Sequence, residues 1–127
     1  MKKTIVVVDD HVLIAKALQG IINNFAAFEV IYVCENGKDL INKFASNCKI
    51  PDIILLDISM PIMDGWDFMD NYAKIKPQLS KKITVYMVSS SINDEDIKRA
   101  KAIADITDYV VKPVSYDKLL ELFQLAA

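Results

Sequence analysis

Three aspartates and one lysine stand where short apolar runs of the chain end. In order along the sequence, residues 4–8 precede Asp9 and Asp10, residues 53–56 precede Asp57, and residues 109–111 precede Lys112. Apolar runs without alternation are typical of strands that are buried on both faces of a parallel sheet. Ligands bind at the carboxyl ends of the strands in such a sheet. We therefore expect these four side chains to meet at one edge of one sheet.

These residue types favour phosphoryl chemistry at a divalent cation. Carboxylates held close together raise one another's pKa, and Mg²⁺ relieves this cost because it prefers oxygen ligands. We expect Asp10 and Asp57 to hold Mg²⁺, with Asp9 reaching it through water. Asp57 is the candidate nucleophile toward phosphorus, in a reaction that asks the protein mostly for positioning and charge stabilisation. Lys112 would pair with one phosphoryl oxygen, and the hydroxyl of Ser89 could donate to another.

The composition narrows the possible classes of protein. The 127 residues are 53% hydrophobic, which is typical of one packed domain, and we expect residues 1–127 to form a single domain with no output domain. The net charge of −2 argues against a nucleic-acid partner. Two cysteines are too few for a four-cysteine zinc site. The apolar stretches are too short to cross a membrane, so we expect a cytoplasmic protein.

Strand-like and helix-like segments alternate along the chain. The expected strands cover residues 4–8, 28–33, 53–57, 83–88 and 109–111. The expected helices cover residues 11–24, 37–46 with Asn36 as cap, 66–76, a segment that starts at 93–95, and a last segment capped by Ser115. This alternation predicts an α/β fold, a doubly wound five-stranded parallel sheet, and we favour the strand order 2-1-3-4-5.

Taken together, the motifs resemble the receiver domain of two-component response regulators over nearly the whole chain. The matching residues are Asp9-Asp10, the stretch 57–65 (DISMPIMDG), Ser89, Tyr109 and Lys112-Pro113. The resemblance implies a CheY-like, flavodoxin-like fold. It also implies that a sensor histidine kinase or a histidine phosphotransfer protein phosphorylates Asp57.

The resemblance further implies the roles of several site residues. Mg²⁺ would be bound by Asp10, Asp57 and the backbone carbonyl of Ser59, and the peptide before Pro113 would be cis. Ser59 and Ser91 occupy positions that, in the family, influence how quickly water removes the phosphoryl group. Both are small and polar here.

The leading hypothesis is a phosphorylation-dependent switch that regulates an unknown target protein. Phosphorylation would draw Ser89 and Lys112 inward, and Tyr109 would fill the space that Ser89 leaves. The surface of the fourth helix, fifth strand and fifth helix would change as a result. The expected protein is a monomer or weak homodimer and not an enzyme, apart from promoting its own phosphorylation and dephosphorylation. The alternative is a phosphorelay intermediate that passes the phosphoryl group to another histidine.

Other interpretations fit the residues less well. A flavodoxin needs a phosphate-cradling loop after the first strand, where Asp9, Asp10 and His11 stand instead. A haloacid-dehalogenase-type phosphatase needs an acid at the position of Ser59. An interaction module with a vestigial pocket is disfavoured because every expected site residue is present. His11, the only histidine, is expected at the rim of the site, where it could tune access or local charge.

Overall fold

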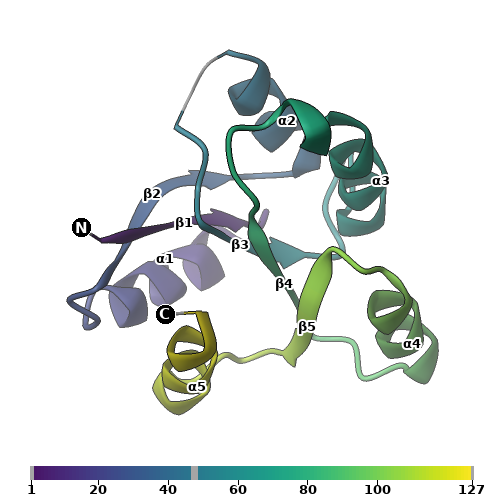
Figure 1. Ribbon diagram of the computed structural model, residues 1–127. Helices are drawn as coiled ribbons and strands as arrows, with labels where there is room; N and C mark the ends of the chain where they lie inside the picture. Colours follow the sequence, from purple (N-terminus) through teal and green to yellow (C-terminus); the bar gives the residue numbers. More distant parts are fainter. Residues whose placement is uncertain (1, 47–48, 127) are drawn as a thin grey trace.

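A five-stranded parallel sheet in the order β2-β1-β3-β4-β5 lies at the centre of the computed structural model, which describes residues 2–46 and 49–126 (Figure 1). The strands are β1 (Lys3–Val8), β2 (Phe28–Cys34), β3 (Ile53–Asp57), β4 (Thr84–Ser89) and β5 (Ile106–Val111). The helices are α1 (Val12–Ile22), α2 (Gly37–Ala45), α3 (Gly65–Ile75), the 3₁₀ helix η1 (Lys76–Gln78), α4 (Asp94–Ala102) and α5 (Tyr116–Ala126). The predicted doubly wound fold and its strand order are confirmed.

The helices cover both faces of the sheet. Helices α1 and α5 lie on one face, and α2, α3 and α4 lie on the other (Figure 1). Each face has its own hydrophobic core, and β1 supplies both of them. Val6 and Val8 pack into the core under α2, α3 and α4, whereas Ile5 and Val7 pack into the core under α1 and α5. This division explains why the strand has an unbroken apolar run, since successive side chains point to opposite faces and both faces are buried.

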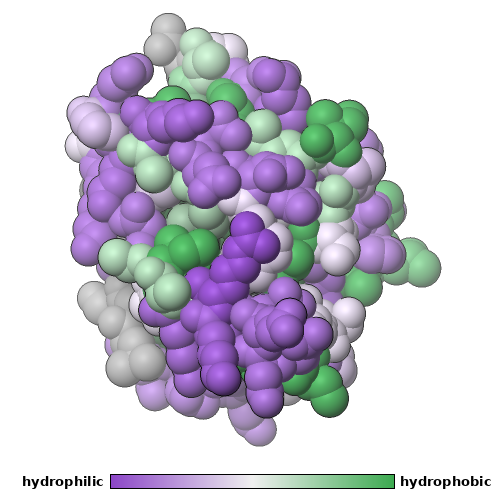
Figure 2. Space-filling model, turned by 90° about the vertical axis from the view of Figure 1, so that its right-hand side faces the viewer, coloured by the Kyte–Doolittle hydropathy of each residue, from purple (hydrophilic) through white to green (hydrophobic). Residues whose placement is uncertain are grey.

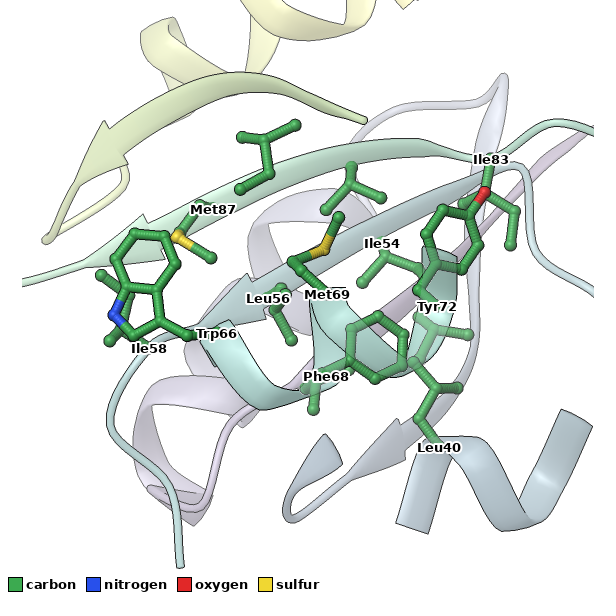
Figure 3. Close-up of a cluster of buried hydrophobic side chains, with 14 of the residues drawn as sticks. Leu40, Ile54, Leu56, Ile58, Trp66, Phe68, Met69, Tyr72, Ile83 and Met87 are labelled. Atoms are coloured by element: carbon green, nitrogen blue, oxygen red, sulfur yellow. The ribbon is translucent and has the colours of Figure 1, made fainter. Parts of the chain in front are cut away.

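Helix α3 contributes several large side chains to the core under α2, α3 and α4. Trp66, Phe68, Met69 and Tyr72 are all buried; Trp66 lies beside Met87 of β4, and Phe68 lies beside Leu40 of α2 (Figure 3). Burying a side chain of this size contributes about 1.5–3 kcal/mol relative to leaving it in water. The guanidinium of Arg99 on α4 lies 4.5 Å from the centre of the Trp66 ring, so a cation–π contact joins α3 and α4.

The outer surface on the α3 and α4 side is largely hydrophilic. Figure 2 shows this side with polar residues over most of its area and separate, small hydrophobic areas between them. Helix α4 explains part of this character, because three acidic residues begin it and basic residues stand in its last turn. The charges are placed as the helix dipole favours, with carboxylates near the N-terminus and cations near the C-terminus.

The fifth strand is longer than predicted. It begins at Ile106, three residues before the expected start, and pairs with β4. Thr107 and Asp108 are exposed, whereas Ile106 and Val110 are buried. The strand lies at the edge of the sheet, so its first half has no continuous apolar run that a sequence pattern could detect. At the other helices and strands, the predicted ends differ from the observed ends by at most two residues, and β3 matches at both ends.

Two predicted helix caps are present. Asn36 accepts a hydrogen bond from the Asp39 backbone at 2.9 Å, and Ser115 accepts one from the Lys118 backbone at 3.1 Å. Each cap satisfies one backbone N–H that has no partner within its helix. The cap of α1 differs from the prediction, which placed His11 within the helix. His11 is the N-cap residue, and its side chain makes no capping hydrogen bond.

Candidate functional site

The predicted site residues converge at the carboxyl edge of the sheet. Asp9 directly follows β1, Asp57 ends β3, Ser89 ends β4, and Lys112 directly follows β5. Because the strand order places β1 beside β3, and β3 beside β4, residues far apart in the sequence become neighbours. The Lys112 backbone N–H also donates to the Ser89 carbonyl at 2.8 Å, which joins the ends of β5 and β4. The peptide bond between Lys112 and Pro113 is cis.

Lys112 connects two buried carboxylates. Its Nζ lies 2.7 Å from Oδ2 of Asp9 and 3.4 Å from Oδ2 of Asp57. The side chains of Asp9 and Asp57 are 2% and 6% exposed, and that of Lys112 is 11% exposed. Removing ions from water in this way is costly unless each charge is paired, and here one ammonium serves both carboxylates. The remaining oxygen of Asp57, Oδ1, accepts a hydrogen bond from the Ile58 backbone at 2.9 Å.

The pKa of the Asp57 carboxyl is raised above its ordinary value. Burial is the main cause, because it disfavours the charged form. The ammonium of Lys112 opposes the rise, and the nearby carboxylate of Asp9 adds to it. A second positive charge beside Asp57 would therefore favour the ionised form, which is the form that can act as a nucleophile.

Asp10 has a carboxylate oxygen without a partner. Its Oδ1 is buried and accepts no hydrogen bond from the described residues. Nδ1 of His11 lies 3.1 Å from this oxygen but does not have the geometry of a hydrogen bond to it. An unsatisfied buried acceptor costs free energy unless a donor or a cation is close by. This oxygen is thus available to a cation.

The donor set fits a hard divalent cation. Within the described chain, Asp9, Asp10, His11 and Asp57 each offer one ligand atom, and these atoms lie within 4.8 Å of one another. Carboxylate oxygens are the ligands that Mg²⁺ prefers. Ser59, whose carbonyl was expected to complete the ligands, is an exposed residue at the rim of the same site. The acidic cluster can therefore bind a metal ion.

A cavity of about 550 Å³ opens onto this cluster. The polar part of its wall is formed by His11, Asp57, Ser59, Ser89, Ser90 and Lys112. The apolar part comes from α1 and from the segment after β5, through Ile14, Ala17, Leu18, Ile21, Pro113 and Val114. Asp57 is buried and lines this cavity, so the cavity gives a reacting group a route to the carboxylate.

The two predicted switch residues are connected through Ser91. The buried hydroxyl of Ser89 accepts a hydrogen bond from the Ser91 backbone N–H at 3.1 Å. The hydroxyl of Tyr109 donates to the Ser91 carbonyl at 2.8 Å. The Ser91 side chain in turn donates to Asp96 on α4 at 2.8 Å. The segment after β4 therefore connects the floor of the site, the Tyr109 ring and helix α4.

Sequence reasoning did not foresee two features of this arrangement. It placed His11 at the rim, and the side chain is indeed 60% exposed, but Nδ1 of its ring lies among the aspartate oxygens. It assigned Ser91 an influence on phosphoryl lifetime and no connection to Tyr109 or Asp96. The His11 and Ser91–Asp96 contacts are local but depend on side-chain rotamers, and the Tyr109–Ser91 contact depends on how β5 packs beside the segment after β4, so no sequence pattern signals them.

The chain belongs to the response regulator receiver domain family, whose model matches residues 5–124. It is similar to the chemotaxis protein CheY of Thermotoga maritima, with 31% identity over 121 residues that cover 95% of this chain and 94% of that protein. It is also similar to the protein-glutamate methylesterase/protein-glutamine glutaminase of Yersinia pseudotuberculosis, with 33% identity over 117 residues and 88% of this chain covered. The chain spans only 30% of the length of that enzyme.

Solved structures agree with this assignment. A two-component response regulator from Cytophaga hutchinsonii matches with a TM-score of 0.87 and 27% identity, covering 99% of this chain and 98% of that one. A CheX–CheY–BeF₃–Mg²⁺ complex from Borrelia burgdorferi contains a chain that matches with a TM-score of 0.82 and 25% identity, covering 98% and 90%. The predicted membership of the CheY-like receiver family is therefore confirmed.

In the described part of the chain, no helix combines the length and the apolar character that crossing a membrane requires.

Proposed function

We propose that this protein is a signalling switch that accepts a phosphoryl group on Asp57 from a phosphohistidine of a sensor histidine kinase or histidine phosphotransfer protein. The observation that carries the proposal is the position of the Asp57 carboxylate, in the wall of a cavity, 3.4 Å from Lys112 and beside Asp9 and Asp10. An acceptor of this kind needs a positive environment for the incoming phosphoryl oxygens and a route for a partner's side chain. Lys112 supplies one positive charge, the proposed Mg²⁺ would supply the remainder, and the cavity supplies the route.

In the proposed reaction, an Asp57 carboxylate oxygen attacks phosphorus while the bond from phosphorus to the partner's imidazole nitrogen breaks. The electron pair of that bond stays on the imidazole, and Asp57 becomes an acyl phosphate. Bound Mg²⁺, held by Asp10, Asp57 and the Ser59 carbonyl, would neutralise charge on the phosphoryl oxygens. Lys112 then moves toward the phosphoryl group, because the new negative charge competes with Asp9 for its ammonium.

The partner kinase has an apolar surface to contact beside the cavity. Val12 and Leu13 at the start of α1 are 56% and 82% exposed, and Ile14 extends from the surface into the cavity wall. Exposed apolar side chains grouped at the entrance of a reactive site are typical of a protein-docking surface. We place this reaction in the cytoplasm, where the kinase domains of two-component systems present their phosphohistidine.

Ser91 supplies the proposed route from the site to the output surface. When the Ser89 hydroxyl turns to donate to a phosphoryl oxygen, the segment after β4 follows it, since Ser91 is bonded to that hydroxyl. Tyr109 then loses its bond to the Ser91 carbonyl, and α4 is displaced through the Ser91–Asp96 bond. The altered surface of α4, β5 and α5 regulates a target protein. The shift requires a difference of only a few kcal/mol between the two states.

Incubation with Mg²⁺ and acetyl phosphate tests the proposal. We expect intact-mass analysis to show one added phosphoryl group on the wild-type protein and none on the Asp57→Asn variant. Omitting Mg²⁺ should abolish the addition as well. An unmodified wild-type protein, or a modified Asp57→Asn variant, would contradict the proposal.

A second measurement follows the switch. Amide chemical shifts of the beryllofluoride-treated protein should change in α4 and β5, and the Tyr109→Phe variant should show smaller changes there while its Asp57 is still phosphorylated. Incubating the phosphorylated protein with candidate histidine phosphotransfer proteins distinguishes a terminal switch from a phosphorelay intermediate, because only the intermediate passes its phosphoryl group to a histidine.

A further inference from the structure

His11 is held against the acidic cluster by its own backbone. Its N–H donates to Oδ1 of Asp9 at 2.8 Å, directly before α1 begins. The imidazole Nδ1 lies 3.1 Å from Oδ1 of Asp9 and 3.1 Å from Oδ1 of Asp10. The ring nitrogen therefore lies between two carboxylates that come from consecutive residues, while the rest of the ring is exposed.

This position is that of a metal ligand. Nδ1 of His11 belongs to the group of ligand atoms, with oxygens of Asp9, Asp10 and Asp57, that lie within 4.8 Å of one another. Two ligands on opposite sides of a small divalent cation are separated by about 4.2 Å, twice a metal–ligand distance of about 2.1 Å. Only a small contraction is thus needed. Asp10 belongs to this group, and its buried Oδ1 accepts no hydrogen bond from the described residues, so a cation beside Nδ1 would also satisfy this oxygen.

We propose that Nδ1 of His11 is itself a metal ligand and that the site binds transition-metal dications such as Ni²⁺, Co²⁺ or Zn²⁺ in addition to Mg²⁺. This inference rests on the cation site of the proposed function. A neutral imidazole is a good ligand for these cations and adds little for Mg²⁺, which prefers oxygen. The same carboxylates serve both classes of cation. His11 therefore sets which cation the site prefers and leaves the affinity for Mg²⁺ nearly unchanged.

Calorimetric titration of the wild-type protein and of His11→Asn and His11→Ala tests the preference at one fixed pH. We expect the affinity for Ni²⁺ to fall at least about tenfold in both variants, as expected for removal of a group that supports a metal site. The affinity for Mg²⁺ should change less than about twofold. His11 is exposed, so both variants should fold, and circular dichroism checks this. An unchanged ratio of Ni²⁺ to Mg²⁺ affinity would overturn the inference.

The Asp10→Asn variant distinguishes a metal site formed by several ligands from metal binding to the exposed His11 imidazole alone. If several residues form the metal site, loss of the Asp10 carboxylate weakens the binding of both Ni²⁺ and Mg²⁺. If Asp10→Asn keeps the wild-type Ni²⁺ affinity, the metal binds His11 alone and the inference is wrong. If the wild-type protein binds no Mg²⁺, the cation site of the proposed function is wrong and this inference falls with it.

The single histidine permits a direct observation of the bond. In ¹⁵N-labelled protein, all imidazole nitrogen signals come from His11, since the chain has no other histidine. With Zn²⁺ as the probe, we expect a large shift of the Nδ1 signal, whereas Mg²⁺ should leave that signal nearly unchanged. An Nδ1 signal that Zn²⁺ leaves unchanged would show that His11 is not a ligand, which contradicts the proposal.

Discussion

Lys112 forms its shorter ion pair with Asp9: Nζ lies 2.7 Å from the Asp9 carboxylate and 3.4 Å from that of Asp57. Asp9 and Lys112 are 103 positions apart in the sequence, and their pairing joins the end of β1 to the end of β5. The candidate phosphoacceptor therefore shares its lysine with a neighbour. This sharing has consequences for stability that can be measured.

Replacing Lys112 with methionine should lower the free energy of unfolding by about 3 kcal/mol in metal-free buffer. The substitution leaves the buried Asp9 carboxylate without its cation, and an unpaired buried charge is strongly destabilising. Urea unfolding measures the change. Lys118→Met is the matched control, because its partner Glu121 is exposed and 3.6 Å away, and it should cost less than about 0.5 kcal/mol. Equal stabilities of the two variants would contradict the assigned role of Lys112.

Replacing Asp57 with asparagine should stabilise the metal-free protein at neutral pH. Burial, with a smaller contribution from Asp9, raises the pKa of the folded Asp57 carboxyl against the opposing effect of Lys112. The folded state therefore holds the proton more tightly than the unfolded chain, so stability declines as the pH rises from the unfolded pKa through the folded one. The gain from asparagine should be full above the folded pKa and absent below the unfolded pKa. Urea midpoints at pH 7 and near pH 4 measure it, with the exposed Asp70→Asn as control.

Mg²⁺ should raise the unfolding midpoint of the wild-type protein more than that of Asp57→Asn. A ligand at ten times its dissociation constant stabilises the folded state by about 1.4 kcal/mol. The asparagine lacks one of the proposed oxygen ligands, so it should gain less at the same Mg²⁺ concentration. Thermal unfolding with and without Mg²⁺ measures both shifts. Identical shifts would place the cation away from Asp57.

Asp52 should show the opposite pH dependence. Partial burial acts to raise the pKa of its carboxyl, but Lys81 and the backbone and hydroxyl of Thr4 together hold this pKa below its ordinary value. Its contribution to stability is therefore present above the unfolded pKa and is lost as the pH falls through the folded pKa. Asp52→Asn should cost about 1 kcal/mol at neutral pH, because the group is partly exposed. If the cost, followed by urea unfolding, persists at low pH, the ion pair is not its cause.

Gly65 should not tolerate alanine. A Cβ at this position would lie 2.5 Å from the Asp57 carbonyl oxygen and 3.0 Å from Cα of Ile58, so the backbone that carries Asp57 must shift. We expect a loss of about 2–3 kcal/mol in the free energy of unfolding. Gly20 is the control, since a Cβ there meets no atom within 4 Å and alanine favours the helix, giving a gain of about 0.5–1 kcal/mol. A Gly65→Ala variant as stable as wild type would contradict the close approach.

Local sequence patterns were sufficient to predict the architecture and the edge of the sheet at which the candidate site residues gather. The unbroken apolar runs before Asp9 and Asp57 are buried strands, and their ends meet at one edge of the sheet. Asn36 and Ser115 cap helices because their side chains reach backbone groups only three residues away. Such signals are short-range, so a sequence displays them. The start of β5 was missed for the same reason, because exposed Thr107 and Asp108 break the local pattern.

Only the tertiary structure decided how the site residues are paired. Lys112 lies closer to Asp9 than to Asp57, at 2.7 Å against 3.4 Å, and a sequence pattern does not carry such a difference. The same holds for the position of Nδ1 of His11 and for the Asp10 oxygen that accepts no hydrogen bond from the described residues. The contact of Tyr109 with Ser91 likewise joins a strand to a loop that precedes it by 18 positions. These side-chain positions follow from the packing of the two hydrophobic cores around the sheet, because residues that are distant along the chain fix one another's positions there. The sequence alone specified the residue types and the edge at which they gather; their hydrogen bonds and charge pairs required the folded chain.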